Sequence, residues 1–86
     1  MVDKATTIAS CDGFQYTPEA EERLNGCALR AFGTESGMEL LHYLENITIY
    51  NLTGPNASDK YLQHLEGQRW IVGIIKRRMA LAKKEK

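Results

Sequence analysis

The sequence predicts a small all-α domain of three helices, with a long C-terminal helix and an extended N-terminal arm. Two observations predict this fold class. Apolar residues recur at helical spacing over most of residues 17–86, and cap and breaker residues divide that region into three segments. The chain has 86 residues, enough for one domain that buries only about two-thirds of its surface. We therefore divide it into an arm, residues 1–16, and a three-helix domain, residues 17–86, that ends in a basic tail.

The arm shows no helical or strand period and is rich in Asp, Thr, Ser and Gly. Its aromatic residues Phe14 and Tyr16 are the expected anchors. Such arms often become ordered only when they lie on a neighbouring surface. That surface is either the body of the same chain or an adjacent protein, so we treat both aromatic residues as candidate partner-binding residues.

The first helix is expected over residues 18–32. Thr17 can cap it, and Pro18 suits the first helical position. Gly26 inside the helix is expected to permit close approach of another backbone. Gly33 is expected to end the helix in the left-handed conformation. Cys27 or Ala28 is expected to share the buried face with three larger residues, Leu24, Leu29 and Phe32.

The second helix is expected over residues 35–48, with Thr34 or Ser36 as its cap and a capping box from Ser36 to Glu39. A loop with a Gly-Pro pair follows. The third helix is expected over residues 57–83, with Asn56 or Ser58 as its cap. We expect the core to form around six residues of the three helices: Leu24, Phe32, Leu41, Leu44, Leu65 and Ile75.

The long third helix carries more apolar surface than one packing partner needs, because Trp70, Ile71 and Ile74 lie beside its main apolar stripe. Gly67 and Gly73 together cost about 2 kcal/mol of helix propensity, so we expect another helix or loop to pack closely there. Arg69 can pair with Glu66 three residues earlier. The candidate partner-binding residues are therefore Phe14, Tyr16, Gly67, Arg69, Trp70, Ile71 and Ile74.

The net charge of zero hides an uneven distribution of charge. Residues 1–68 hold four Lys/Arg and ten Asp/Glu, which sum to −6, and residues 69–86 hold seven Lys/Arg and one Glu, which sum to +6. Such a chain can assemble head to tail or place its basic end on an acidic surface. A solvated helix end is the simpler interpretation. The candidate phosphate contacts are Lys76, Arg77, Arg78, Lys83 and Lys84.

No catalytic constellation, metal-binding spacing or cofactor motif is found in the sequence. We therefore expect a non-enzymatic protein without metal or cofactor. Cys11 and Cys27 are expected to be free thiols in a reducing compartment, because no secretory leader is evident. No apolar run approaches the length of a membrane span.

Residues 32–41 (FGTESGMELL) and 66–69 (EGQR) resemble a family of small tailed-phage proteins of the podophage type, encoded among virion-structure genes. The family pattern is an aromatic residue, a turn with Thr and Gly, a Leu-rich helix, a loop, and an Asn/Glu-Gly-x-Arg segment that opens an apolar helix. The resemblance covers roughly residues 30–76.

The resemblance implies a structural protein, present in many copies in the virion and in the host cytoplasm during assembly. Its partners would be portal, tail, capsid or internal ejection proteins, with homo-oligomers expected. The alternative is a nucleic-acid-associated packaging or regulatory factor that uses the basic C-terminal helix.

Overall fold

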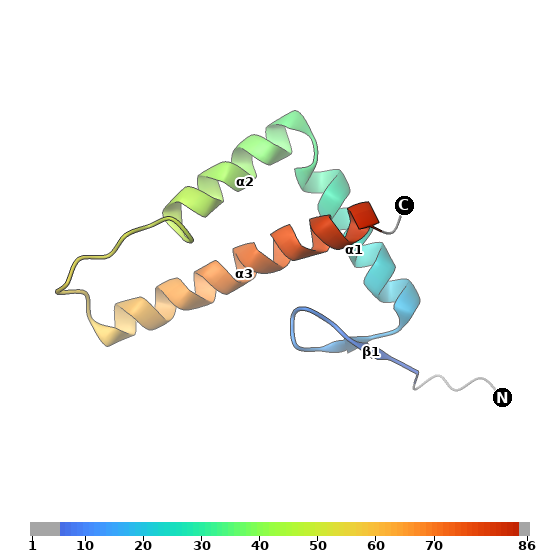
Figure 1. Ribbon diagram of the computed structural model, residues 1–86, viewed down its shortest axis with the longest axis horizontal. Helices are drawn as coiled ribbons and strands as arrows, with labels where there is room; N and C mark the ends of the chain where they lie inside the picture. The colour runs from blue at the N-terminus through green and yellow to red at the C-terminus, as the bar shows by residue number, and fades with distance from the viewer. Residues whose placement is uncertain (1–5, 85–86) are drawn as a thin grey trace.

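The computed structural model describes residues 6–84, and these residues form three helices and a short two-stranded sheet (Figure 1). In chain order the elements are β1 (Ile8–Ala9), β2 (Gln15–Tyr16), α1 (Pro18–Phe32), α2 (Glu35–Ile47) and α3 (Asp59–Lys84). The predicted three-helix layout is confirmed, with helix bounds within two residues of those expected.

The helices begin where local capping chemistry predicts. Thr17 accepts the backbone N–H of Ala20 at 3.2 Å, directly before Pro18. Thr34 accepts from Gly37 at 3.0 Å, so Ser36 lies inside α2 and the predicted capping box does not form. Ser58 caps α3 by accepting the N–H of Tyr61 at 3.1 Å.

Two predictions about glycines are wrong. Gly33 ends α1 with φ −87°, a right-handed conformation, and not the left-handed one expected. At Gly26 an added Cβ would meet only the side chain of Arg30 on the same helix. The tight position is instead Gly37, where a Cβ would lie 2.2 Å from the carbonyl oxygen of Ala31. Gly37 therefore allows the sharp corner between α1 and α2.

The N-terminal region departs from the expected extended arm, because residues 8–16 form an antiparallel hairpin with Ile8 opposite Tyr16. Gly13 supplies the positive φ of the turn, at 88°. Asp12 stabilises the turn by accepting the N–H of Phe14 at 2.9 Å. An Asp-Gly pair is a strong hairpin signal. The part of the predicted arm before residue 6 lies outside the described residues.

The apolar core lies along one side of α3, where Leu65, Val72, Met79 and Ala82 are buried together with Leu41 of α2. Phe32, Leu44 and Ile75 pack around it as predicted. Leu24 does not, since it is 39% exposed. Cys27 is also exposed, and Ala28 occupies the buried side of α1 instead. Both differences arise because the surface of α1 that packs across α3 is partly polar.

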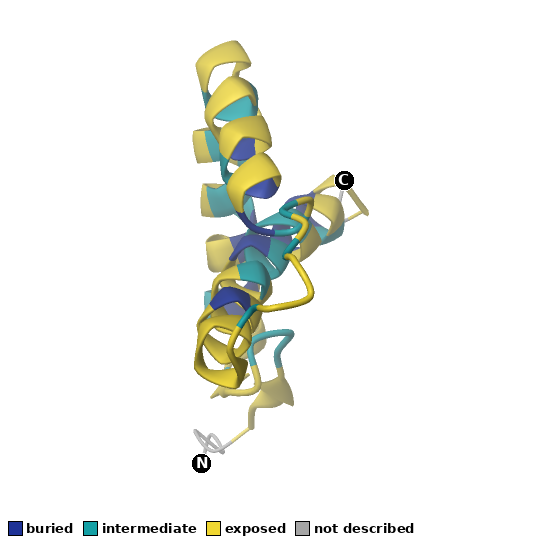
Figure 2. Cartoon of the chain, turned by 90° about the vertical axis from the view of Figure 1, so that its left-hand side faces the viewer, coloured by how far each residue is buried: buried dark blue, intermediate teal, exposed yellow. Residues whose placement is uncertain are grey.

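The fold is a flat layer, two helices thick where α1 packs across α3. Its principal extents are 58 × 31 × 15 Å, and its radius of gyration is 15.9 Å, against about 12 Å for a compact chain of this length. α1 crosses the C-terminal half of α3, while α2 lies on one side of α3 (Figure 1). Figure 2 shows the buried positions inside this layer and exposed residues over much of the ribbon. A layer of this kind leaves two broad faces in contact with solvent.

Candidate protein-binding surface

An open groove of about 790 Å³ runs along the side of α3 that faces away from the core. We call it the outer-face groove. One hairpin residue, Cys11, lines it together with eight residues of α3: Gln63, Glu66, Gly67, Arg69, Trp70, Gly73, Ile74 and Arg77.

The helical repeat explains why the groove lies on the outside. Leu65, Val72 and Met79 are seven residues apart and face the core. Trp70 precedes Val72 by two residues, about 200° of helical rotation, so it points away from that core. Its side chain is 53% exposed, and that of Ile71 is 54% exposed. Trp and Ile at such exposure are typical of surfaces that bind another protein.

The two glycines of α3 have no neighbour that would explain them. An added Cβ at Gly67 or Gly73 would meet nothing within 4 Å. The expectation of close packing at these positions is therefore wrong within the chain. Because both residues line the groove, their lack of side chains deepens it. The helix-propensity cost of about 1 kcal/mol for each glycine is not offset by any packing among the described residues.

Arg69 forms part of the groove wall and is held in place from within. Its guanidinium donates at 2.9 Å to the carbonyl oxygen of Thr48 and at 2.9 Å to that of Asn51. It also forms the predicted ion pair with Glu66, at 3.3 Å. These bonds tie the C-terminal end of α2 and the loop after it to α3.

The groove brings together four of the residues predicted to bind a partner: Gly67, Arg69, Trp70 and Ile74. Ile71 is exposed on α3, one residue after Trp70. Phe14 is 66% exposed on the hairpin that supplies Cys11 to the groove. Tyr16 is not on this surface, because it belongs to an internal polar cluster.

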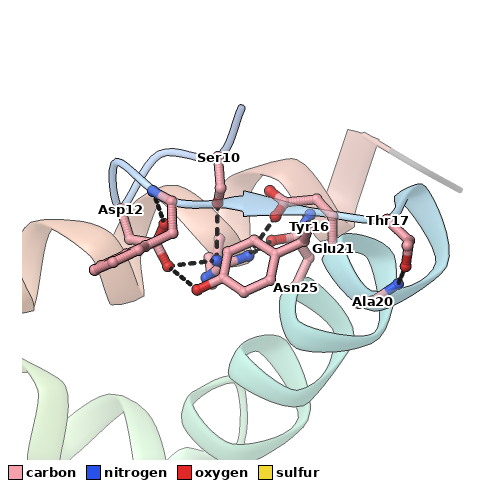
Figure 3. Close-up of polar contacts among 9 residues, drawn as sticks. Ser10, Asp12, Tyr16, Thr17, Ala20, Glu21 and Asn25 are labelled. Carbon is pink, nitrogen blue, oxygen red and sulfur yellow. Dashed lines mark hydrogen bonds and ion pairs between the residues drawn. The ribbon is translucent and has the colours of Figure 1, made fainter. Parts of the chain in front are cut away.

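That cluster surrounds Arg78, whose residue is only 6% exposed (Figure 3). The Arg78 cluster contains Ser10, Asp12 and Tyr16 of the hairpin segment, Glu21 and Asn25 of α1, and Arg78 of α3. In Figure 3 the side chains of Ser10, Asp12, Tyr16, Glu21 and Asn25 surround one guanidinium. The cluster joins the hairpin and the start of α1 to a residue of α3 more than fifty positions later.

The guanidinium is bonded on both of its terminal nitrogens. Nη1 donates to Asn25 at 2.8 Å, and Nη2 donates to Ser10 at 2.9 Å and to Asp12 at 3.2 Å. The Tyr16 ring centroid lies 5.7 Å from the guanidinium carbon, within range of a cation–π contact. These bonds indicate that Arg78 has a structural role, since a buried charge is tolerated only when it is paired and hydrogen-bonded.

Glu21 supplies the second negative charge. Its Oε1 lies 3.3 Å from Nη1 of Arg78 and makes no hydrogen bond. The residue is 8% exposed, so its compensation comes from the ion pair. Two carboxylates therefore face one guanidinium, and loss of the arginine would leave the buried Glu21 and the half-buried Asp12 without a cation.

Asp12 and Tyr16 influence each other's protonation. The hydroxyl of Tyr16 donates to Oδ2 of Asp12 at 2.6 Å. This bond lowers the pKa of Asp12 below its usual 3.8, assisted by the N–H of Phe14 and by Arg78. The same bond raises the pKa of Tyr16 above its usual 10.0. The hairpin is thus held on the body by an ionised Asp12 and a neutral Tyr16.

The basic end of α3 is less available than the sequence suggested. Arg78 is buried, and Lys76 forms an ion pair with Glu45 that raises the pKa of the lysine. Among the five candidate phosphate contacts, Arg77, Lys83 and Lys84 are exposed. The assignment of Lys76 and Arg78 as phosphate contacts is corrected, because carboxylates of the same chain already engage them.

The sequence did carry a signal for the Arg78 cluster. Glu21 and Asn25 precede Ala28 and Phe32 at helical spacing, so they occupy the buried face of α1. Arg78 likewise lies one helical turn from Ile75 and from Ala82 on α3. Polar residues within an apolar stripe require a polar partner, although the spacing does not identify it.

Over residues 6–84, no group of three or more His, Cys, Asp or Glu is placed to hold a metal ion. Cys11 and Cys27 are both free. None of the helices in this part of the chain has the length and apolar character needed to cross a membrane. No protein-family model matches the chain, and neither curated proteins nor solved structures give a significant match.

Proposed function

We propose that this chain is a non-enzymatic structural protein, a small virion component present in many copies. It would assemble in the host cytoplasm and bind portal, tail, capsid or internal ejection proteins. The virion setting comes from the sequence resemblance of residues 32–41 and 66–69. The observation that carries the structural role is the outer-face groove on a flat, elongated fold.

The exposed area supports a role in assembly. The accessible surface of the chain is 6484 Å², whereas a compact monomer of this mass exposes roughly 5,100 Å². The excess of about 1,400 Å² exceeds the roughly 800 Å² that each partner buries in a standard protein–protein interface. A chain of this size gains stability when a partner covers such surface.

The chemistry of the groove supports a protein as the ligand. Trp70 offers a large apolar ring, Gly67 and Gly73 offer space beside it, and Arg69 is held in one orientation. A rigid aromatic residue with room around it is the usual centre of a binding interface. The groove also lacks the enclosed polar pocket that small-molecule enzymes need.

The nucleic-acid alternative has less support. Two of its five candidate phosphate contacts are engaged by Glu45, Asp12 and Glu21 of the same chain. The exposed remainder, Arg77, Lys83 and Lys84, is not interleaved with aromatic residues that could stack on bases.

Mass spectrometry of purified particles of the phage that encodes the chain tests the proposal. We expect the wild-type chain in several copies per particle, and a marked loss when Trp70 is replaced by Ala. Lys84→Ala, at the exposed end of α3, is the control that should leave incorporation unchanged. Absence of the chain from particles, with a thermally stable monomer that binds no virion protein, would contradict the proposal.

A further inference from the structure

Four residues of the outer-face groove form one straight stripe on α3. Glu66, Trp70, Gly73 and Arg77 follow one another at intervals of four, three and four residues. This is the spacing of the contact seam between two packed helices. All four line the groove, and Trp70 is the large residue among them.

The stripe is complementary to itself when it is reversed. If two copies of α3 run antiparallel about a twofold axis between residues 71 and 72, residue 66 faces residue 77 and residue 70 faces residue 73. Glu66 of each copy then lies opposite Arg77 of the other. Trp70 of each copy lies opposite Gly73, where nothing within 4 Å occupies the space of a side chain.

We infer that the outer-face groove binds a second copy of this chain, through antiparallel packing of the two α3 stripes. The inference deepens the proposed function and rests on it, because it names one partner of the same groove. Each indole would fill the space left by the partner's Gly73, and two ion pairs between Glu66 and Arg77 would flank the pair of rings. This arrangement gives Gly73 a packing role that the single chain does not provide.

Charge favours the antiparallel orientation. A parallel pair would place Glu66 against Glu66 and Arg77 against Arg77, and like charges across a helix interface disfavour that pairing. Arg77 has no ion pair among residues 6–84, whereas Glu66 has only the exposed contact with Arg69.

The available area is consistent with a dimer. The excess exposure of about 1,400 Å² over a compact monomer is more than one partner needs to bury in a standard interface. Cys11 of the hairpin lines the groove together with Arg77. The partner helix therefore crosses α3 near residues 66–77 and does not follow its whole length, and exposed Phe14 is left beside the crossing.

Sedimentation velocity of the full chain over a concentration series tests the inference. We expect a reversible dimer for the wild type. Gly73→Leu should raise the dimer Kd at least about thirtyfold, because the added side chain fills the space needed by the indole. It should not unfold the monomer, since a Cβ at this position meets no neighbour and Leu favours helix over Gly. Gln68→Leu, an exposed site outside the groove, is the matched control and should leave the Kd unchanged.

A charge exchange tests the antiparallel register. Glu66→Arg and Arg77→Glu should each weaken the dimer, because each places like charges opposite one another. The double variant restores opposite charges in the antiparallel arrangement and should recover the wild-type Kd within about threefold. Circular dichroism of each variant checks that the helices remain folded.

A wild-type chain that is monomeric at all concentrations would overturn the inference, as would a dimer that Gly73→Leu leaves unchanged. Failure of the double charge exchange to recover the Kd would also overturn it, because the proposed register would then be wrong. These results are distinguishable from failure of the proposed function. A monomer whose Trp70→Ala variant is lost from particles contradicts only the second-copy partner, whereas a dimer absent from particles contradicts only the virion role.

Discussion

The two sides of α3 differ in which side chains they bury and which they expose. On the side facing α1 and the hairpin, Arg78 is 6% exposed and is surrounded by polar partners. On the outer face, Trp70 is 53% exposed and borders open space at Gly67 and Gly73. The chain thus buries an arginine and leaves its only tryptophan in solvent.

This contrast separates the part of α3 that closes the domain from the part that is available to a partner. Arg78 joins α3 to elements more than fifty residues earlier in the chain, and its loss should affect the whole fold. The outer face contributes little to the fold of a single chain, so substitutions there should change association instead. Substitutions on the two sides of α3 therefore test whether folding and association depend on different residues.

Arg78→Ala should be the most damaging substitution. It leaves the buried side chain of Glu21 without a cation and removes the partner of Asp12. Breaking a buried ion pair such as Arg78–Glu21 costs about 3–5 kcal/mol. That loss approaches the whole stability expected of a domain of this size. Urea unfolding followed by circular dichroism should show a largely unfolded chain. Lys84→Ala, an exposed cation on the same helix, should change the free energy of unfolding by less than about 0.5 kcal/mol; similar values for the two variants would refute the division.

Arg69→Ala should have a smaller and more local effect. It removes the donors to the carbonyl oxygens of Thr48 and Asn51, which we expect to cost about 1–3 kcal/mol. Hydrogen exchange should become faster at the C-terminal end of α2 and in the following loop, while the amides of α1 remain protected. Arg69→Lys keeps the charge without the planar fork and should give an intermediate result. Uniform loss of protection across all three helices would contradict a local role.

Acid should release the hairpin before it unfolds the helices. The folded pKa of Asp12 lies below its usual value of 3.8. Its carboxylate therefore adds stability above about pH 4, and this contribution is lost as the pH falls through the lower folded pKa. Near-ultraviolet circular dichroism of Tyr16 and the other aromatic residues should change in this range. In Asp12→Asn the change should be reduced, because the titrating group is absent; an identical acid transition would exclude Asp12 as its origin.

Ile71→Gln should have the smallest effect on the fold. Ile71 is 54% exposed on α3 and does not line the groove, and glutamine is a good helix former. In the dilute monomer the free energy of unfolding should change by less than about 0.5 kcal/mol. A substantially larger loss in denaturant titrations would mean that this exposed isoleucine contributes to the fold of the single chain.

The bounds of the helices were predictable because their causes are local. Thr17 with Pro18, Thr34, and Ser58 each act within four residues of the helix they begin. The exposed position of Trp70 also followed from helical spacing alone. The hairpin was missed although Asp12 and Gly13 form a known turn signal, because strands of two residues leave no measurable alternation in the sequence.

The candidate surface was predicted only in part. Gly67, Arg69, Trp70 and Ile74 do line one groove. Tyr16 and Arg78 belong instead to the Arg78 cluster, and Lys76 is paired with Glu45. Whether a cation on a helix faces solvent or a carboxylate depends on how the neighbouring helix crosses it. Helical spacing assigns residues to faces without stating what covers each face.

Three helices and their approximate ends could be predicted from the sequence alone. So could the position of Trp70, off the main apolar stripe of the longest helix. Both could be predicted because caps, breakers and the helical repeat act over a few residues. The role of Arg78 in holding the hairpin and α1 against α3 is visible only in the tertiary structure. Its partners lie more than fifty residues from it along the chain: Ser10, Asp12, Glu21 and Asn25. The tertiary structure also shows that Gly67 and Gly73 border open space. Local sequence rules cannot show this, because they do not say which element, if any, packs beside a helix position.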